Sequence, residues 1–253
     1  MTPDTKRNEP AAAGTEGATD ATEATDALRD VIARARVVLW DFDGPICRLF
    51  ARHTAEGVAG ELVEWLESRG LHGLLTPGER RSPDPQILLR AVEDRHPGSD
   101  LVAELEERLT QEELQATESA MPTAYADPLI RTWSAVGSPM AITTNNSARA
   151  ARAYLAGRGL IDCFAPHIYG RTQDLRLLKP DPYCLNRALS ATGTAPSAAV
   201  MIGDSPTDWE AATRAGIPFV GYARGESGEK RLRAAGAEHV VRTLETLLRI
   251  VRQ

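Results

Sequence analysis

The feature that most constrains the fold is a regular alternation of short apolar runs with segments of helical periodicity. Apolar runs occupy residues 37–40, 140–144, 166–169, 198–202 and 219–222, and a shorter one lies at His239. They are short and rich in β-branched residues, as buried strands are, and stretches with helical spacing separate them. Strands that alternate with helices in this way predict an α/β fold, in which helices cover both faces of a parallel sheet.

The alternation is interrupted once, directly after the first strand. Residues 47–121 have apolar positions at helical spacing, such as Val58, Leu62 and Leu66, and predict three or four helices with turns at 76–78 and 96–98. We therefore expect an inserted helical cap at 47–121 and a catalytic core made of residues 27–46 and 122–253. Residues 1–26 are small, polar and acidic and predict a flexible tail, with a helix beginning near Ala27.

Composition excludes several classes of protein. The 253 residues carry a net charge of −6, which disfavours a nucleic-acid-binding surface. No apolar run approaches the roughly 20 residues of a membrane span, and no signal peptide begins the chain. The three cysteines are widely spaced and predict neither a disulfide framework nor a zinc site, so we expect a cytoplasmic protein.

Two carboxylates follow the first strand in the sequence Asp41-Phe42-Asp43-Gly44. In a parallel sheet, ligands bind beyond the carboxyl ends of the strands, which is where this loop falls. Asp41 is a candidate nucleophile, and Asp43 is a candidate general acid and base. Gly44 permits a sharp change of backbone direction. The alternative is an ordinary turn, since Asp and Gly are common turn residues.

Polar residues also follow other strands. Thr144 and Asn145 open a helix, where a hydroxyl and free N–H groups can bind phosphate, although such residues are also ordinary helix caps. Asp204 is a candidate magnesium ligand, and Asp208 is either a ligand or the end of a Ser205-x-x-Asp208 capping box. Lys179 is one of only three lysines beside 26 arginines, which suggests that a compact ammonium group is needed to neutralise Asp41 and a phosphate oxygen.

Taken in order, these pieces resemble the four motifs of the haloacid dehalogenase-like hydrolase superfamily over roughly residues 36–250. The resemblance implies a Rossmann-like core with a helical cap inserted after the first motif. It also implies Mg²⁺ held by Asp41, Asp204, Asp208 and the backbone carbonyl of Asp43. The implied activity is hydrolysis of a small phosphorylated metabolite through an aspartyl phosphate, by a monomer or a homodimer. A phosphosugar mutase and a non-catalytic module that binds a phosphate ligand are the alternatives.

Substrate choice is expected to depend on residues near the first motif and in the cap. Arg48, with Phe50, Arg52 and His53 beside it, is a candidate for substrate binding, whereas Arg80 and Arg81 are better explained as solvated surface charges. Arg171 follows a strand and either reaches the site or forms a structural ion pair. Nothing near Cys47 marks it as a reactive thiolate. The cap is acidic and contains no lysine between Ile46 and Met121, which disfavours a large polyanionic substrate.

Overall fold

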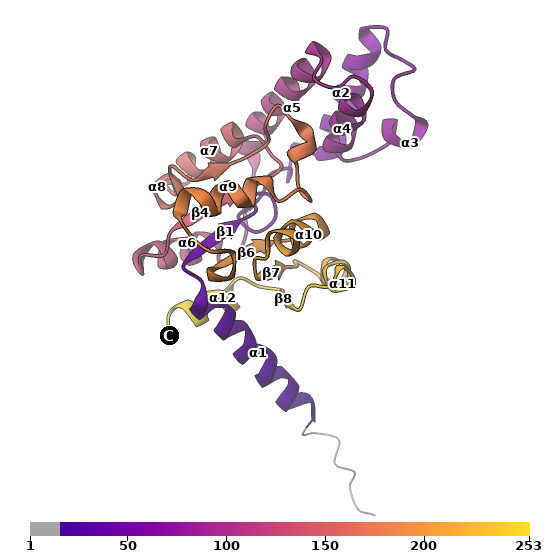
Figure 1. Cartoon of the computed structure of the whole chain (residues 1–253). Coiled ribbons are helices and arrows are strands. Elements are labelled where there is room, and N and C mark those ends of the chain that lie inside the picture. Colours follow the sequence, from indigo (N-terminus) through magenta and orange to yellow (C-terminus); the bar gives the residue numbers. More distant parts are fainter. Residues whose placement is uncertain (1–15) are drawn as a thin grey trace, which may run out of the picture.

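A computed structural model describes residues 16–253 and the side chains from residue 25 onward. Its centre is a parallel sheet of six strands in the order β5-β4-β1-β6-β7-β8 (Figure 1). The predicted α/β fold is therefore confirmed. The strands are β1 (Val37–Trp40), β4 (Met140–Thr143), β5 (Ile168–Tyr169), β6 (Ala199–Gly203), β7 (Phe219–Tyr222) and β8 (His239–Val241).

Alternate residues of the central strands pack into two different clusters, one on each face of the sheet. Val38 and Trp40 pack with helices α1 (Glu16–Arg34), α6 (Ala126–Ala135), α7 (Ala148–Gly157), α8 (Ile161–Phe164) and α12 (Glu245–Val251). Val37 and Leu39 pack with helices α9 (Tyr183–Thr192), α10 (Pro206–Ala215) and α11 (Glu226–Ala235). Because β1 is buried on both faces, it can hold a charged residue at its end in a fixed position.

Four helices lie between β1 and α6, in the segment for which three or four were predicted. They are α2 (Ala55–Ser68), α3 (Pro77–Arg80), α4 (Pro85–Arg95) and α5 (Asp100–Ser119), and they lie at one end of the molecule (Figure 1). Helices α2, α4 and α5 form a third apolar cluster, to which α3 contributes no residue. The chain enters and leaves this segment through a short antiparallel pair, β2 (Cys47–Arg48) and β3 (Met121–Pro122). We refer to residues 47–121 as the cap.

The observed elements differ from the predicted ones in a few places. The predicted turn at 76–78 is wrong, because Thr76 and Glu79 form a capping box that starts helix α3. Helix α1 begins at Glu16, before the expected Ala27, and the rest of the predicted tail lies outside the described residues. The β2–β3 pair, α8 and the 3₁₀ helices η1 (Leu175–Leu177) and η2 (Pro196–Ala198) were not predicted.

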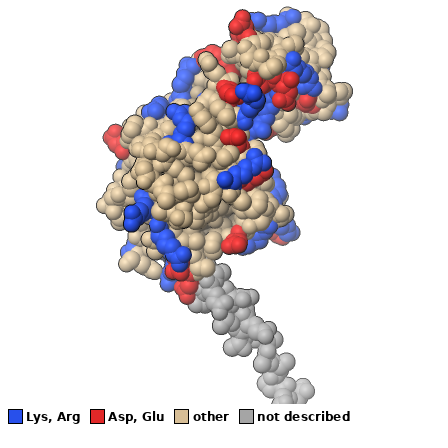
Figure 2. All heavy atoms as spheres, in the orientation of Figure 1, with Lys and Arg blue, Asp and Glu red and all other residues tan. Residues whose placement is uncertain are grey.

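Two findings bear on the predicted exclusions. Within residues 16–253, no helix is long and apolar enough to cross a membrane. Figure 2 shows acidic and basic side chains interspersed over the visible face, with no broad surface of one sign.

Candidate active site

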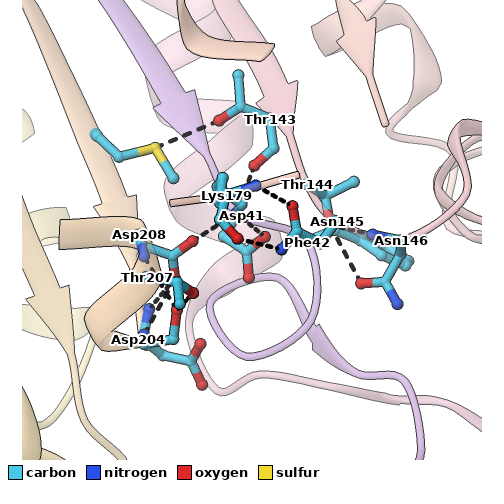
Figure 3. A network of polar contacts seen from close by, with 12 residues as sticks. Asp41, Phe42, Thr143, Thr144, Asn145, Asn146, Lys179, Asp204, Thr207 and Asp208 are labelled. Carbon is cyan, nitrogen blue, oxygen red and sulfur yellow. Dashed lines mark hydrogen bonds and ion pairs between the residues drawn. The ribbon is translucent and has the colours of Figure 1, made fainter. Parts of the chain in front are cut away.

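The carboxyl ends of three neighbouring strands bring the predicted site residues together (Figure 3). Asp41 follows β1, the central strand of the three, while Thr144 follows β4 and Asp204 follows β6. Strand β1 pairs in parallel with both β4 and β6, so the three polar ends lie at one edge of the sheet. Lys179 reaches this edge from the loop between η1 and α9.

Lys179 is the centre of the polar network. Its side chain is only 2% exposed, and its ammonium donates to Asp41 Oδ1 (2.7 Å), to Asp208 Oδ1 and to the Thr143 carbonyl (2.9 Å). All three N–H groups of the ammonium are therefore used. Burial lowers the pKa of Lys179, but the Asp208 and Asp41 carboxylates outweigh burial and raise that pKa, so the residue stays charged.

Asn145 fixes the backbone of Lys179. Its Oδ1 accepts the Lys179 N–H (2.7 Å), and its Nδ2 donates to the Lys179 carbonyl (3.1 Å). The cap contributes as well, since Arg90 of α4 donates to the same carbonyl (2.7 Å). The side-chain amide of Asn145, a predicted phosphate-binding group, is thus engaged with Lys179.

Thr144 lies beside Asp41 but is mostly buried, and its hydroxyl contacts Asn146. The backbone N–H groups at the start of α7, which were expected to be free for a phosphate, in part donate hydrogen bonds to the protein itself. The N–H of Ser147 donates to Glu113 Oε2 (2.8 Å), so a carboxylate from cap helix α5 takes the place predicted for a phosphate there. Phosphate binding near this loop is thereby limited to its side facing Asp41.

Glu113 and Arg171 form a buried ion pair, so Arg171 has the structural role that the sequence left open. Arg171 donates to both Glu113 oxygens (2.8 and 3.1 Å) and to the Asn145 carbonyl (3.1 Å). Its remaining contacts are Thr110 and Glu106 of the same cap helix. The pair links α5 to the loop that holds Lys179.

The sequence left two roles open for Asp208, metal ligand and helix cap, and its hydrogen bonds show the helix cap. Its Oδ2 accepts from the Asp204 and Ser205 N–H groups (both 3.1 Å) and from the Ser205 hydroxyl, while Oδ1 accepts from Lys179. The capping box of α10 is present. Because both oxygens already accept hydrogen bonds, Asp208 orients its neighbours, and Asp41 and Asp204 retain more capacity to bind a cation.

The donor set fits a hard divalent cation. Carboxylate oxygens of Asp41, Asp204 and Asp208 lie within 4.8 Å of one another, and in the described chain no hydrogen-bond donor contacts the Asp204 carboxylate. Gly44 makes this approach possible, since a Cβ at its position would lie 2.3 Å from Asp204 Cγ, at a φ of +118°. Oxygen ligands that converge in this way suit Mg²⁺.

Burial shifts the acidic groups toward their neutral forms. It raises the pKa of Asp41 to about 7, although Lys179 lowers it, and raises the pKa of Asp43 to about 6. Burial also raises the pKa of Asp204, with help from Asp41 and Asp208. Asp43 Oδ1 accepts the Leu49 N–H (2.8 Å), which orients the second oxygen for proton transfer.

The other predicted residues have different positions. Arg48 lies beside the first motif, where its guanidinium contacts Met121 Sδ. His53 pairs with Glu112 (2.7 Å). Arg80 was predicted to be a solvated surface charge, but it is only partly exposed and pairs with Glu67. Cys47 is buried, and burial raises the pKa of its thiol, which agrees with an unreactive cysteine.

Three residues of the site were missed from the sequence: Arg90, Glu113 and Thr123. The Thr123 hydroxyl donates to the Gly44 carbonyl (2.6 Å) and supports the turn after Asp43. Glu113 and Arg90 lie on amphipathic helices whose charged residues resemble a solvated face. No local signal distinguishes them, because their roles depend on how the cap packs against the core.

Two cavities meet at the carboxylates. The first, which we name the cap cleft, has a volume of 350 Å³ and lies between Asp41, Lys179 and the start of α4. The second has a volume of 680 Å³ and lies on the side of β7 and α11. Asp43, Phe50 and Asp204 line both cavities, so the two are continuous at the site.

Comparison with known proteins gives concordant results. A family model described as a haloacid dehalogenase-like hydrolase matches residues 35–216. Phosphoglycolate phosphatase from Rhodospirillum rubrum is 39% identical over 111 residues, which are 44% of each chain. The phosphoglycolate phosphatase from Thiobacillus denitrificans is 38% identical over 100 residues, which are 38% of this chain and 43% of that protein. These matches span less than half of the relatives' length.

Solved structures share the fold over most of the chain. A predicted phosphatase from Clostridium acetobutylicum has a TM-score of 0.65 at 16% identity, with 85% of this chain and 97% of that chain covered. CbbY from Rhodobacter sphaeroides, in complex with phosphate, has a TM-score of 0.63 at 18% identity, with 87% and 100% covered. At such identities, the likeness establishes the fold alone.

Proposed function

Because the chain belongs to the haloacid dehalogenase-like hydrolase family, we propose that it is a Mg²⁺-dependent phosphatase of small phosphorylated metabolites. The observation that carries the proposal is the contact of Lys179 with Asp41. This contact occupies Asp41 Oδ1 and leaves the other oxygen for attack on phosphorus. A carboxylate held in place at a strand end, with a fixed cation beside it that favours its ionised form, is a suitable nucleophile.

The proposed reaction has two displacements. In the first, an oxygen of Asp41 bonds to phosphorus, the ester P–O bond breaks, and the Asp43 carboxyl gives its proton to the departing oxygen. In the second, Asp43 takes a proton from water, the water oxygen bonds to phosphorus, and the bond to Asp41 breaks to release inorganic phosphate. A pKa of about 6 for Asp43 suits a group that must both give and accept a proton.

Asp41 and Asp204 would hold the Mg²⁺, with the Asp43 carbonyl as a third ligand. When bound, the cation offsets the charge of the phosphate oxygens and of the clustered carboxylates. Lys179 contributes a fixed positive charge beside Asp41. Thr144, at the end of β4, lines the cap cleft together with Asp41. We therefore propose that Thr144 contacts a phosphate oxygen.

Phosphoglycolate is the substrate that we propose to test first, because both relatives described above are phosphoglycolate phosphatases. The size of the cap cleft favours a small substrate, since 350 Å³ is at the lower end of ligand pockets. The cap residues that line this cleft include no lysine or arginine in the described chain. This composition argues against a long polyanionic substrate.

The experiment measures phosphate release from an aryl phosphate and from 2-phosphoglycolate, with Mg²⁺ and with excess EDTA. We expect activity that requires Mg²⁺ and that Asp41→Asn abolishes, because the amide is a poor nucleophile. Activity that survives EDTA, or that persists in Asp41→Asn, contradicts the mechanism. Binding of phosphate esters without turnover would favour a non-catalytic module, and transfer of phosphate within a sugar without release would favour a mutase.

A further inference from the structure

The 680 Å³ cavity extends from the catalytic carboxylates along the side of β7 toward α11, and the first residues of the cap, among them Arg48 and Phe50, also line it. Asp43 and Asp204 line it at one end, and Tyr222 at the end of β7 lies along it. Its basic wall consists of Arg48, which follows the first motif, and of Arg224 and Arg231, which lie before and within α11. We name it the arginine cavity.

Among the described residues, no carboxylate forms an ion pair with any of these three arginines. Thirteen other arginines of the described chain form ion pairs with carboxylates, and Arg48, Arg224 and Arg231 are not among them. Arg48 has one contact, with the weakly accepting sulfur of Met121. Three guanidinium groups around one cavity, each free to donate, form a binding site for anionic oxygens.

The start of α11 adds to this wall. Ser227 and Gly228, in its first turn, line the cavity, and no side chain caps the helix at Gly225. Helix N-termini carry unpaired N–H groups and favour anions. The acidic residues of this turn are engaged elsewhere: Glu226 pairs with Lys230, and Glu229 pairs with Arg233 and Arg242.

The electrostatic influence of these arginines reaches the catalytic carboxylates. Burial raises the pKa of Tyr222, whereas Arg224 and Arg48 oppose this rise. Arg48 and Arg224 also line the same cavity as Asp43. The positive charge therefore lies close to the group that would protonate the departing part of a substrate.

The cap cleft is different. Among the described residues, those that the cap contributes to this cleft include no lysine or arginine: Phe50, Ala55, Pro83, Asp84, Pro85, Gln86 and Glu113. A substrate whose departing part carries a negative charge would find no cation there. The arginine cavity is continuous with the same site and offers the missing charge.

We propose that the arginine cavity binds a second anionic group, a carboxylate or a phosphate, of a substrate whose phosphate ester lies at Asp41. This inference rests on the proposed function and narrows it to phosphorylated carboxylates and bisphosphates. Selectivity for such substrates would thus come from Arg224 and Arg231 of the core and from Arg48 in β2, rather than from the helices of the cap.

The experiment compares 2-phosphoglycolate with 2-hydroxyethyl phosphate, which has a hydroxyl in place of the carboxylate, and with a sugar bisphosphate. Variants Arg224→Gln and Arg231→Gln remove one charge each from exposed positions, where folding is not at risk. Arg252→Gln is the matched control, since Arg252 is also exposed and lies in the last turn of the chain, outside the cavity.

We expect each cavity variant to lose at least about 10-fold in kcat/KM on one of the two doubly anionic substrates, mainly through KM, because such a loss corresponds to one charged contact. Turnover of 2-hydroxyethyl phosphate should change less than about twofold in Arg231→Gln. Arg224 lines the same cavity as Asp43, so Arg224→Gln is assessed by the ratio of kcat/KM between the charged and the neutral substrate, in which an effect on the general acid cancels. The substrate that is affected shows whether a carboxylate or a phosphate is bound. Equal losses on charged and neutral substrates, or no loss on either, overturn the proposal.

A second readout separates this proposal from the proposed function. Binding of 2-phosphoglycolate and of the bisphosphate to Asp41→Asn, measured by calorimetry, needs no turnover. If the wild-type protein hydrolyses no ester, the proposed function fails. Weaker binding after Arg224→Gln, but not after Arg252→Gln, would still support the proposal that the arginine cavity binds an anionic group. Unchanged binding in both variants overturns the cavity proposal whatever the activity is.

Discussion

The buried pair of Glu113 and Arg171 offers the sharpest test of how the cap is attached to the core. Both side chains are almost fully enclosed, at 1% and 0% exposure. We expect Glu113→Gln to lower the free energy of unfolding by about 3–5 kcal/mol, the range for a broken buried pair, because Arg171 then keeps only the partly exposed Glu106 as a carboxylate partner among the described residues. The glutamine would also turn an N–H group toward Arg171 or the Ser147 N–H, which are both donors.

The assay is reversible unfolding in urea, followed by circular dichroism and supported by thermal unfolding. A loss of this size corresponds to a fall in Tm of about 6–20 °C for a chain of this length. Arg171→Met should cost a similar amount. The loss of unfolding free energy in the double variant should be smaller than the sum of the two single losses by at least about 1 kcal/mol. The reason is that each single variant leaves the other charge without its buried partner, whereas the double variant removes both charges.

Arg149 and Glu107 provide a control pair that involves the same cap helix, α5. They join α7 to α5 as Arg171 and Glu113 join the neighbouring loop to α5, but their side chains are 54% and 52% exposed. Arg149→Gln should therefore cost less than about 1 kcal/mol. The reasoning is refuted if Glu113→Gln costs no more than Arg149→Gln, or if the effects of Glu113→Gln and Arg171→Met are additive.

Two further outcomes are expected at the carboxylates. Gly44→Ala should keep the fold but lose about 100-fold or more in kcat/KM, since its Cβ would displace Asp204; near-normal activity with normal circular dichroism would contradict this. Burial raises the pKa of Asp41 to about 7 and of Asp43 to about 6, above their ordinary value of 3.8. The folded state then binds more protons than the unfolded chain between these values, so the stability of the Mg²⁺-free protein should fall as pH rises through about 4 to 7. Because Mg²⁺ needs ionised carboxylates, it should raise Tm more at about pH 8 than at about pH 5.5 in a thermal-shift assay, and an equal rise at both values would count against the site.

The sheet and the residues at its edge were predictable because their signals are local. A strand buried on both faces is a continuous apolar run, and the residue after it, such as Asp41 or Asp204, is placed by the strand itself. Lys179 was predictable for a different reason, since a lysine is rare in this chain. The structure places it against Asp41, as expected.

The residues that join the cap to the core were not predictable in this way. Glu113 belongs to a helix rich in glutamate, and its sequence neighbours Glu112 and Gln111 are as polar as it is. Only the packing of α5 against α7 decides which of these side chains is enclosed and which is solvated. The role of Asn145 depends on the same packing. Arg171 donates to the backbone carbonyl of Asn145, and the Asn145 side chain accepts the Lys179 N–H.

Helix α5 therefore belongs to both parts of the molecule, although the sequence places it wholly in the cap. Leu105 and Leu109 pack in the apolar cluster of the cap, whereas Ala116 packs in the cluster of the core. Glu113 lies between them and is held from the core side by Arg171 and Ser147. A movement of the cap that carried the second half of α5 along would break this buried pair, at the cost estimated above. Glu106 and Glu107 of the first half of α5 also pair with the core, through Arg171 and Arg149 respectively. We infer that α5 stays with the core from Glu106 onward.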